Sequence, residues 1–188
     1  MNYDIVSFDL DGTLVDTAHE IAAAANQALE AHGMAPRTLA EITCLIGNGS
    51  RQLMLTLLAR ILLEQPDLAT AVRPEDVLRT FDEQLSRTLG SADAAYAGVR
   101  EALQRLRDGG VRLACVTNKE LRHARRVLHA ARLDSLFDLV VGGDSLPQKK
   151  PHPSVLRYVV GTLNADTRRA AHVGDSSTDV DAARNAGV

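Results

Sequence analysis

The sequence contains no apolar run close to the roughly 20 residues that a membrane-spanning helix requires. It begins with MNYDIVSFDLDG, in which acidic residues stand where a signal peptide would carry Lys or Arg. Cys44 and Cys115 are the only cysteines, which excludes a disulfide framework and suits a reducing compartment. We therefore expect a cytoplasmic protein without a membrane partner, in which Cys115, inside an apolar run, is a buried packing residue.

Positive charge is not in excess either. The formal net charge is -3, and the Lys and Arg residues are scattered or interleaved with acids. Nucleic acid is therefore not an expected partner. Internal repeats and low-complexity segments are also absent. With 45% hydrophobic and 24% charged residues, the chain has the composition of a folded protein with a sizeable core.

The sequence does contain short apolar runs that alternate with helical patterns. Strands are predicted at 3–8, 111–116, 138–141 and 170–173, and helices at 99–106, 121–131, 153–163 and 179–186. Strands and helices of these lengths are typical of right-handed βαβ crossovers, which build a parallel sheet covered on both faces. We therefore predict an α/β fold with a doubly wound parallel sheet.

Residues 17–92 interrupt this alternation with helical periodicity. Thr17 and Glu20 have the spacing of a capping box, Ser50 is a candidate cap for a second helix, and Pro74 is a candidate first residue of a third. The segment is therefore predicted to be an inserted all-helical domain. The predicted domains are a core formed by 1–16 and 93–188 and an insert formed by 17–92.

Polar and acidic residues directly follow the predicted strands. In a parallel sheet of this kind, the ligand crevice lies beyond the carboxyl ends of the strands. The residues at these positions are Asp9, Asp11, Thr117, Asn118, 142–144, Gly174 and Asp175. Periodicity alone therefore predicts that acids and phosphate-compatible polar groups share one crevice.

The run DLDGTLVDT at 9–17 is the most informative one. Asp9 and Asp11 follow a strand and can point into one site, where they repel each other unless a cation neutralises them. A hard divalent ion would do this, while Gly12 permits a tight backbone path and Thr13 offers a hydroxyl near the site. An Asp-Gly turn followed by a helix cap is the structural alternative.

This run resembles the nucleophile motif of the haloacid dehalogenase superfamily in its phosphatase form. By that resemblance Asp9 is the nucleophile, and Asp11 is the general acid and base that protonates a leaving group. Asp11 also argues against a true dehalogenase, since those enzymes generally lack an acid there and use no magnesium. The resemblance implies a Rossmann-like core with the helical insert as a cap domain.

Three later segments resemble further motifs of the superfamily, and the first of them is VTNK at 116–119. Thr117 and Asn118 are thereby assigned to phosphate contact, although this pair after a strand is also a common turn or cap.

The run KKPHP at 149–153 resembles a Lys-Pro-x-Pro motif, in which prolines restrict the backbone beside the lysine. The match assigns Lys150 to neutralising charge on Asp9 and on the phosphoryl group, with Lys149 as the competing choice. We expect His152 to be a loop residue.

The run GDSSTD at 174–179 resembles the acidic motif that follows the fourth strand in this superfamily. By that resemblance Asp175 would ligate Mg²⁺ together with Asp9 and the backbone carbonyl of Asp11. Asp179 would contact these ligands without binding the ion itself, or would be an alternative ligand. A role as a helix cap is an equally open alternative.

A loop in the helical insert pairs glycines with a helix start and a cation, features that suit a small anionic group. Its candidate binding residues are Gly47, Asn48, Gly49 and Arg51. Arg51 or the amides of 47–50 are predicted to hold a substrate carboxylate. An ordinary interhelical loop is the alternative.

Together with this loop, the runs VTNK at 116–119, GGD at 142–144 and KKPHP make the chain similar to the bacterial phosphoglycolate phosphatase family. The similarity implies Mg²⁺-dependent hydrolysis of 2-phosphoglycolate, with a small phosphorylated metabolite as partner and a monomer or homodimer as the assembly. Alternatives are a phosphatase of another small sugar or nucleotide phosphate, a pyrophosphatase, a β-phosphoglucomutase-like enzyme, or an inactive binding or regulatory protein of the same fold.

The sequence stops at Val188, whereas members of this superfamily usually continue with another strand and helix. We therefore expect a core that lacks its last strand and a sheet with an unpaired edge.

Overall fold

The computed structural model describes residues 3–90 and 95–188. Its sheet has the order β3-β2-β1-β4, and every neighbouring pair is parallel. The strands are β1 (Ile5–Phe8), β2 (Arg112–Val116), β3 (Leu139–Val141) and β4 (Ala170–Val173). In register, Phe8 at the end of β1 lies between Cys115 of β2 and Val173 of β4. The predicted parallel α/β sheet is confirmed, and β1 is one of its two interior strands.

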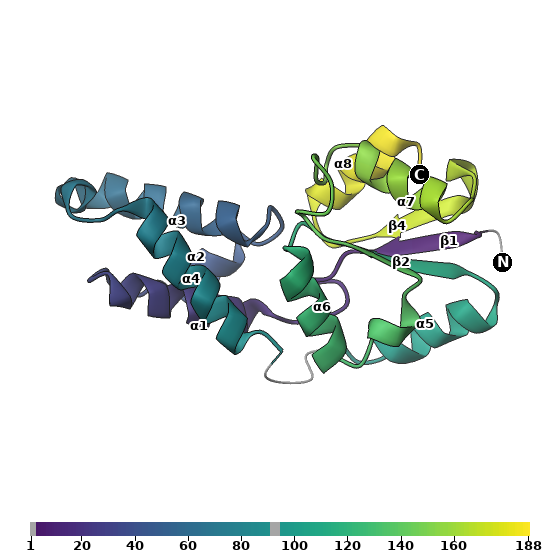
Figure 1. Cartoon of the computed structure of the whole chain (residues 1–188), viewed down its shortest axis with the longest axis horizontal. Coiled ribbons are helices and arrows are strands. Elements are labelled where there is room, and N and C mark those ends of the chain that lie inside the picture. The colour runs from purple at the N-terminus through teal and green to yellow at the C-terminus, as the bar shows by residue number, and fades with distance from the viewer. Residues whose placement is uncertain (1–2, 91–94) are drawn as a thin grey trace.

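Helices cover both faces of the sheet (Figure 1). They are α5 (Val99–Asp108) and α6 (Leu121–Ala130) on one face, and α7 (Ser154–Thr162) and α8 (Ser177–Ala186) on the other. Successive side chains along β2 point to opposite faces of the sheet, so β2 packs against the helices on both faces. Leu113 and Cys115 pack with residues of α5 and α6, whereas Ala114 and Val116 pack with residues of α7 and α8.

The remaining helices form a bundle at the other end of the molecule, beyond the carboxyl end of β1 (Figure 1). They are α1 (Ala18–Ala31), α2 (Leu39–Thr43), α3 (Ser50–Glu64) and α4 (Pro74–Thr88). Small buried residues of α1, among them Ala25 and Ala28, allow α4 to approach and bury Phe81. His32 adds a polar contact, with its Nε2 3.0 Å from Oγ1 of Thr80.

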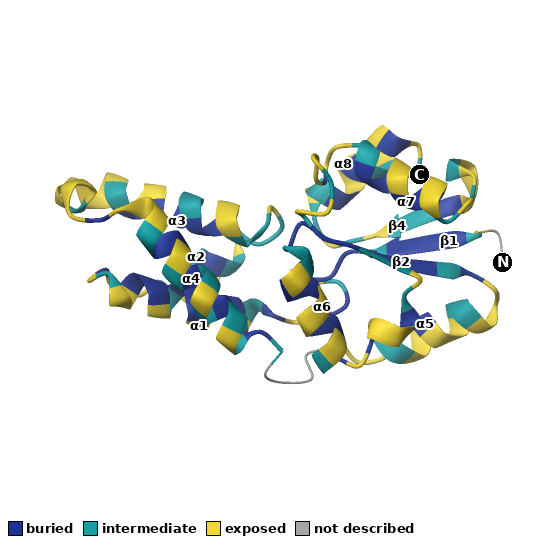
Figure 2. Cartoon of the chain, in the orientation of Figure 1, coloured by how far each residue is buried: buried dark blue, intermediate teal, exposed yellow. Residues whose placement is uncertain are grey.

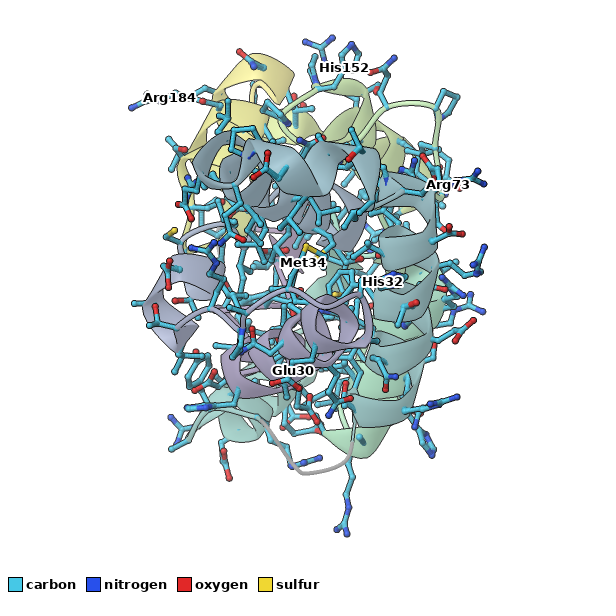
Figure 3. The ribbon with its side chains drawn as sticks, turned by 90° about the vertical axis from the view of Figure 1, so that its left-hand side faces the viewer. Glu30, His32, Met34, Arg73, His152 and Arg184 are labelled. Atoms are coloured by element: carbon cyan, nitrogen blue, oxygen red, sulfur yellow. The ribbon has the colours of Figure 1, made fainter. Side chains whose placement is uncertain are left out.

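The burial pattern follows the predicted periodicity. Figure 2 shows buried stripes on the inner sides of the helices and buried strands in the centre of the sheet. Seen from the bundle end, Met34 lies among the side chains of the bundle and His152 at the edge of the molecule (Figure 3). Met34 is buried and His152 is exposed, so His152 is the loop residue that the sequence predicts.

Two predicted helix caps are wrong. Thr17 occupies the position before α1, but its hydroxyl donates to the carboxylate of Asp11 and makes no capping hydrogen bond. Ser50 is the first residue of α3, and its hydroxyl donates to Glu120. In both cases the hydroxyl donates to a carboxylate of the core, and no side-chain capping hydrogen bond is formed at the helix start.

Shorter elements complete the chain. In residues 3–90 and 95–188, 3-10 helices lie at Pro66–Thr70, Asp134–Leu136 and Thr167–Arg169. The sequence periodicity missed α2, although Thr38 and Glu41 form a capping box at its start. The domain boundary predicted at 92/93 lies outside the described residues. Within the described ranges, no helix has both the length and the apolar composition that crossing a membrane requires.

Candidate active site

Three carboxylates meet where β1 and β4 end. Asp9 directly follows β1, and its backbone N–H donates to the carbonyl of Val173 at 2.8 Å, which holds the two strand ends side by side. Asp175 follows β4, and Asp179 lies in the first turn of α8. One carboxylate oxygen of each of the three acids lies within 4.8 Å of the others. The structure thus brings together Asp9 and Asp175, to which the resemblance assigned one ion.

Lys150 forms ion pairs with two of these acids. Its ammonium nitrogen lies 2.9 Å from Asp9 Oδ1 and 2.6 Å from Asp179 Oδ1, and all three residues are buried. Lys149, the competing choice, instead donates to the carbonyl of Asn48 at 2.6 Å. Lys150 is therefore the lysine positioned to offset the mutual repulsion of the buried carboxylates.

Asp175 is approached closely by the loop after β1. Gly12 has a φ of +85°, and a Cβ atom there would lie 2.5 Å from Asp175 Oδ2, so the loop requires glycine at this position. The hydroxyl of Thr13 donates to Asp175 Oδ1 at 3.0 Å. The structure therefore gives Thr13 a role in orienting Asp175, because the turn carries its side chain toward the end of β4. It does not place Thr13 in the cavity above Asp9.

Asp179 is oriented from two sides. Its Oδ1 lies 3.0 Å from Nε2 of His172, whose Nδ1 lies 2.9 Å from Oγ of Ser7. Its Oδ2 accepts the backbone N–H of Ser176 in a capping box. Asp179 is thus a helix-capping residue that also contributes an oxygen to the group of carboxylates.

The surrounding groups shift the pKa values of Asp9 and Asp179 in opposite directions. Burial raises the pKa of Asp9 above its ordinary value, although the charge of Lys150 opposes this. Burial also acts to raise the pKa of Asp179. There the hydrogen bond with His172 and the charge of Lys150 prevail, so the pKa of Asp179 lies below its ordinary value.

The carboxylates suit a hard divalent cation. Asp9 Oδ1 is buried and, although Lys150 is within ion-pair distance, accepts no hydrogen bond from the described part of the chain. Carboxylate oxygens are the ligands that such cations prefer, and a cation would favour the ionised form of Asp9. Asp9, Asp175 and Asp179 therefore form a group able to hold a metal ion. The backbone carbonyl of Asp11 stays a predicted ligand.

Asp11 has a separate set of partners. The ammonium nitrogen of Lys119 lies 2.8 Å from its Oδ1 and 2.9 Å from its Oδ2, and the hydroxyl of Thr17 also donates to Oδ1. Lys119 is buried. The carboxylate predicted to act as acid and base is therefore fixed by a lysine from the loop after β2 and by the residue that precedes α1.

A cavity lies between these acids and the helical bundle. Its walls come from both parts of the molecule: Asp9, Asp11, Thr117, Asn118 and Lys119 from the core, and Ile21, Ile46, Gly47, Gly49, Ser50 and Leu53 from the bundle. The predicted phosphate-contact residues Thr117 and Asn118 thus line the same cavity as Asp9.

The loop before α3 is attached directly to the core. The side-chain amide of Asn118 donates to the carbonyl of Gly47 at 2.9 Å and to that of Lys150 at 3.0 Å. Gly49 lies close to the backbone of Asn118, and a Cβ atom at Gly49 would be 2.7 Å from the backbone oxygen of Asn118. The loop, whose Gly47, Gly49 and Ser50 line the cavity, is therefore held against the core.

A family model for haloacid dehalogenase-like hydrolases matches residues 6–188. The chain belongs to this family. This hydrolase is 42% identical over 186 residues to a phosphoglycolate phosphatase of Nitrosospira multiformis, covering 97% of this chain and 79% of the relative. It is 40% identical over 183 residues to a phosphoglycolate phosphatase of Cereibacter sphaeroides, covering 97% of this chain and 81% of the relative.

A solved structure supports the same family. The crystal structure of a predicted phosphoglycolate phosphatase from Haemophilus somnus 129pt superposes with a TM-score of 0.92 at 31% sequence identity. The match covers 100% of the hydrolase and 83% of that chain. The arrangement of core and bundle is thus shared by the two proteins.

Two predicted binding residues do not reach the cavity of the hydrolase. Arg51 pairs with Glu75 at 3.0 Å, and its side chain is 59% exposed. Asn48 offers its carbonyl to Lys149. Arg51 lies in the first turn of α3 and pairs with Glu75 of α4, and a contact between Arg51 and a substrate carboxylate stays a prediction.

Three contributors to the site were missed at the level of sequence. They are Lys119, which holds Asp11, His172, which orients Asp179, and Thr17, which was interpreted as a cap. A lysine directly after a predicted strand end was a signal that could have singled out Lys119. His172 lies within a predicted strand, and a polar residue in an apolar run was its only signal.

Proposed function

We propose that this hydrolase is a Mg²⁺-dependent phosphatase that cleaves a small phosphomonoester through a phosphoaspartate on Asp9, with 2-phosphoglycolate as its substrate. The observation that carries the proposal is the meeting of three carboxylates at the strand ends, two of them paired with Lys150, with Asp11 lining the same cavity as Asp9. The phosphoglycolate phosphatases to which the chain is 40–42% identical support this choice of substrate.

In the first step, Asp9 attacks phosphorus, the bond to the leaving oxygen breaks, and Asp11 delivers a proton to that oxygen. Lys150 is already at the carboxylate of Asp9 and offsets charge there as the phosphoryl group arrives. Thr117 and Asn118 line the cavity where phosphoryl oxygens would lie.

In the second step, Asp11 removes a proton from water, and the resulting nucleophile attacks phosphorus of the acyl phosphate. The bond between phosphorus and the Asp9 oxygen breaks, which releases phosphate and restores both carboxyl groups. Mg²⁺ held by Asp9 and Asp175, with Asp179 behind them or as a ligand, would supply neutralisation of the phosphoryl charge.

The helical bundle, predicted as residues 17–92, is proposed to act as a cap over this chemistry. Ile21, Ile46 and Leu53 give the cavity apolar walls, and the loop at 47–50 is fixed to the core by Asn118. Such a lid excludes water and strengthens electrostatic interactions beneath it.

A phosphate-release assay with and without Mg²⁺ tests the proposal. Substrates would be 2-phosphoglycolate, glucose 6-phosphate, a nucleoside monophosphate and pyrophosphate. We expect Mg²⁺-dependent turnover that is highest with 2-phosphoglycolate and is abolished in Asp9→Asn. Asp16→Asn, which makes the same change at an exposed position, should retain activity. Absence of turnover of every phosphate ester would favour an inactive binding protein, and a preference for another ester would replace the substrate.

A further inference from the structure

The cavity above Asp9 has one cationic side chain among the described residues that line it, that of Lys119. The other positive groups nearby are engaged elsewhere. Lys150 lies on Asp9 and Asp179, Lys149 binds the carbonyl of Asn48, and Arg51 pairs with Glu75. A negatively charged leaving group in this cavity would therefore meet Lys119.

The apolar surroundings of Lys119 strengthen the interaction of its charge with an anion in the cavity. Lys119 is 4% exposed, and the bundle contributes the apolar side chains of Ile21, Ile46 and Leu53 to the same cavity. In such an environment an unpaired carboxylate is costly to bury, whereas one that contacts an ammonium group is stabilised. The charge of Lys119 therefore favours substrates with an anionic leaving group over neutral ones.

The ammonium group of Lys119 also has a third N–H donor that Asp11 does not use. Lysine carries three N–H donors, and Asp11 accepts from Lys119 through two oxygens at 2.8 and 2.9 Å. In 2-phosphoglycolate the carboxylate and the ester oxygen are separated by one methylene carbon. A carboxylate bound to Lys119 would therefore keep the ester oxygen close to Asp11, the group assigned to protonate it.

We propose that Lys119 binds the carboxylate of the leaving group, and that it thereby makes the enzyme selective for phosphate esters of 2-hydroxy acids over neutral phosphate esters. This inference rests on the proposed phosphatase function and deepens it, since it assigns substrate selectivity to Lys119 in place of Arg51. Lys119 is thus both a positioning residue for Asp11 and a contact for the substrate.

A comparison of two substrates tests this role. Wild type, Lys119→Met and Arg51→Met would be assayed with 2-phosphoglycolate and with 2-hydroxyethyl phosphate, in which a neutral hydroxymethyl group replaces the carboxylate. Loss of the partner of Asp11 lowers both rates in Lys119→Met. The ratio of the two kcat/KM values is expected to fall about 30-fold or more, as for loss of a buried charged contact. Arg51→Met should keep the wild-type ratio.

Binding of unreactive analogues gives a second readout that does not depend on turnover. By calorimetry in the presence of Mg²⁺, 3-phosphonopropionate should bind wild type more tightly than propylphosphonate, and Lys119→Met should lose this preference. Circular dichroism checks that the variant is folded, and Lys119→Arg should restore part of the preference because it restores the charge.

Three results would overturn the inference. They are a ratio of the two kcat/KM values that is unchanged in Lys119→Met, a ratio that falls in Arg51→Met instead, and a wild type that binds 3-phosphonopropionate no more tightly than propylphosphonate. A wild type that prefers 3-phosphonopropionate through Lys119 but turns over no ester would contradict the proposed function and leave the binding role in place.

Discussion

Lys150 and Asp179 form a buried ion pair of 2.6 Å, and the same ammonium nitrogen lies 2.9 Å from Asp9. One lysine therefore separates the proposed nucleophile from an acid whose pKa is held below its ordinary value. Because Asp9 and Asp179 would repel each other without it, we expect Lys150 to contribute both to the proposed chemistry and to the stability of the strand ends.

Replacement of this lysine should affect kcat more than KM. In Lys150→Met the charge on Asp9 and on the transferring phosphoryl group loses its partner, and kcat is expected to fall about 100-fold or more. Steady-state kinetics with 2-phosphoglycolate measure this. Lys149→Met removes the same charge one position away and should lower kcat far less; equal losses in the two variants would contradict the assignment.

The loop before α3 should tolerate no side chain at Gly49. Its φ is +89°, and a Cβ atom would lie 2.7 Å from the backbone oxygen of Asn118. Gly49→Ala is expected to displace the loop and to lower kcat/KM by up to about 100-fold through loss of positioning.

Gly33→Ala is the matched control for this variant. Gly33 also has a positive φ, +73°, but a Cβ atom there would meet no atom of the described residues within 4 Å. Ala is strained at both positions, and more so at Gly49, whose φ of 89° and ψ of 154° lie in a region that essentially only glycine adopts. A comparable loss of activity in Gly33→Ala would show that strain alone, and not contact with the core, explains the effect.

His172 is expected to contribute to stability. Its side chain is fully buried and contacts both Ser7 and Asp179. His172→Leu leaves both groups without this partner and should lower the free energy of unfolding by about 1–3 kcal/mol. Urea denaturation measures the change. His152→Leu, at an exposed loop position, should change it by less than about 0.5 kcal/mol.

The two cysteines should differ sharply in reactivity. Cys44 is exposed, whereas Cys115 is buried in β2, and burial raises the pKa of its thiol well above the ordinary value. A thiol reagent should modify one cysteine in the native protein and both in denaturant. Cys44→Ser should leave no reactive thiol in the native state, and rapid labelling of that variant would contradict the burial of Cys115.

The sequence predicted the strands and the strand-end acids because their signals are local. An apolar run such as 111–116 identifies a strand by itself, and the parallel topology then places Asp9 near Asp175 without knowledge of any contact. Lys150 was assigned by its match to the Lys-Pro-x-Pro motif of the superfamily, with Lys149 as the competing choice.

The sequence-based interpretation was wrong or incomplete where a side chain contacts a residue that is distant in sequence. Ser50 and Thr17 look like helix caps, but their hydroxyls bind Glu120 and Asp11 in the core. Lys119 lies 108 positions from Asp11, and no local pattern reports that pairing. The ion pair of Arg51 with Glu75 likewise depends on how α3 and α4 pack, which no local pattern reports.

Because β1 is hydrogen-bonded to β2 on one side and to β4 on the other, the backbone that presents Asp9 can be released only by parting it from both neighbours. Amide protons of this strand should accordingly be among the slowest to exchange with deuterium, whereas those of short α2 should exchange early. The carboxylate proposed as the nucleophile is thus carried by an interior strand of the sheet, which keeps it in place while substrates come and go.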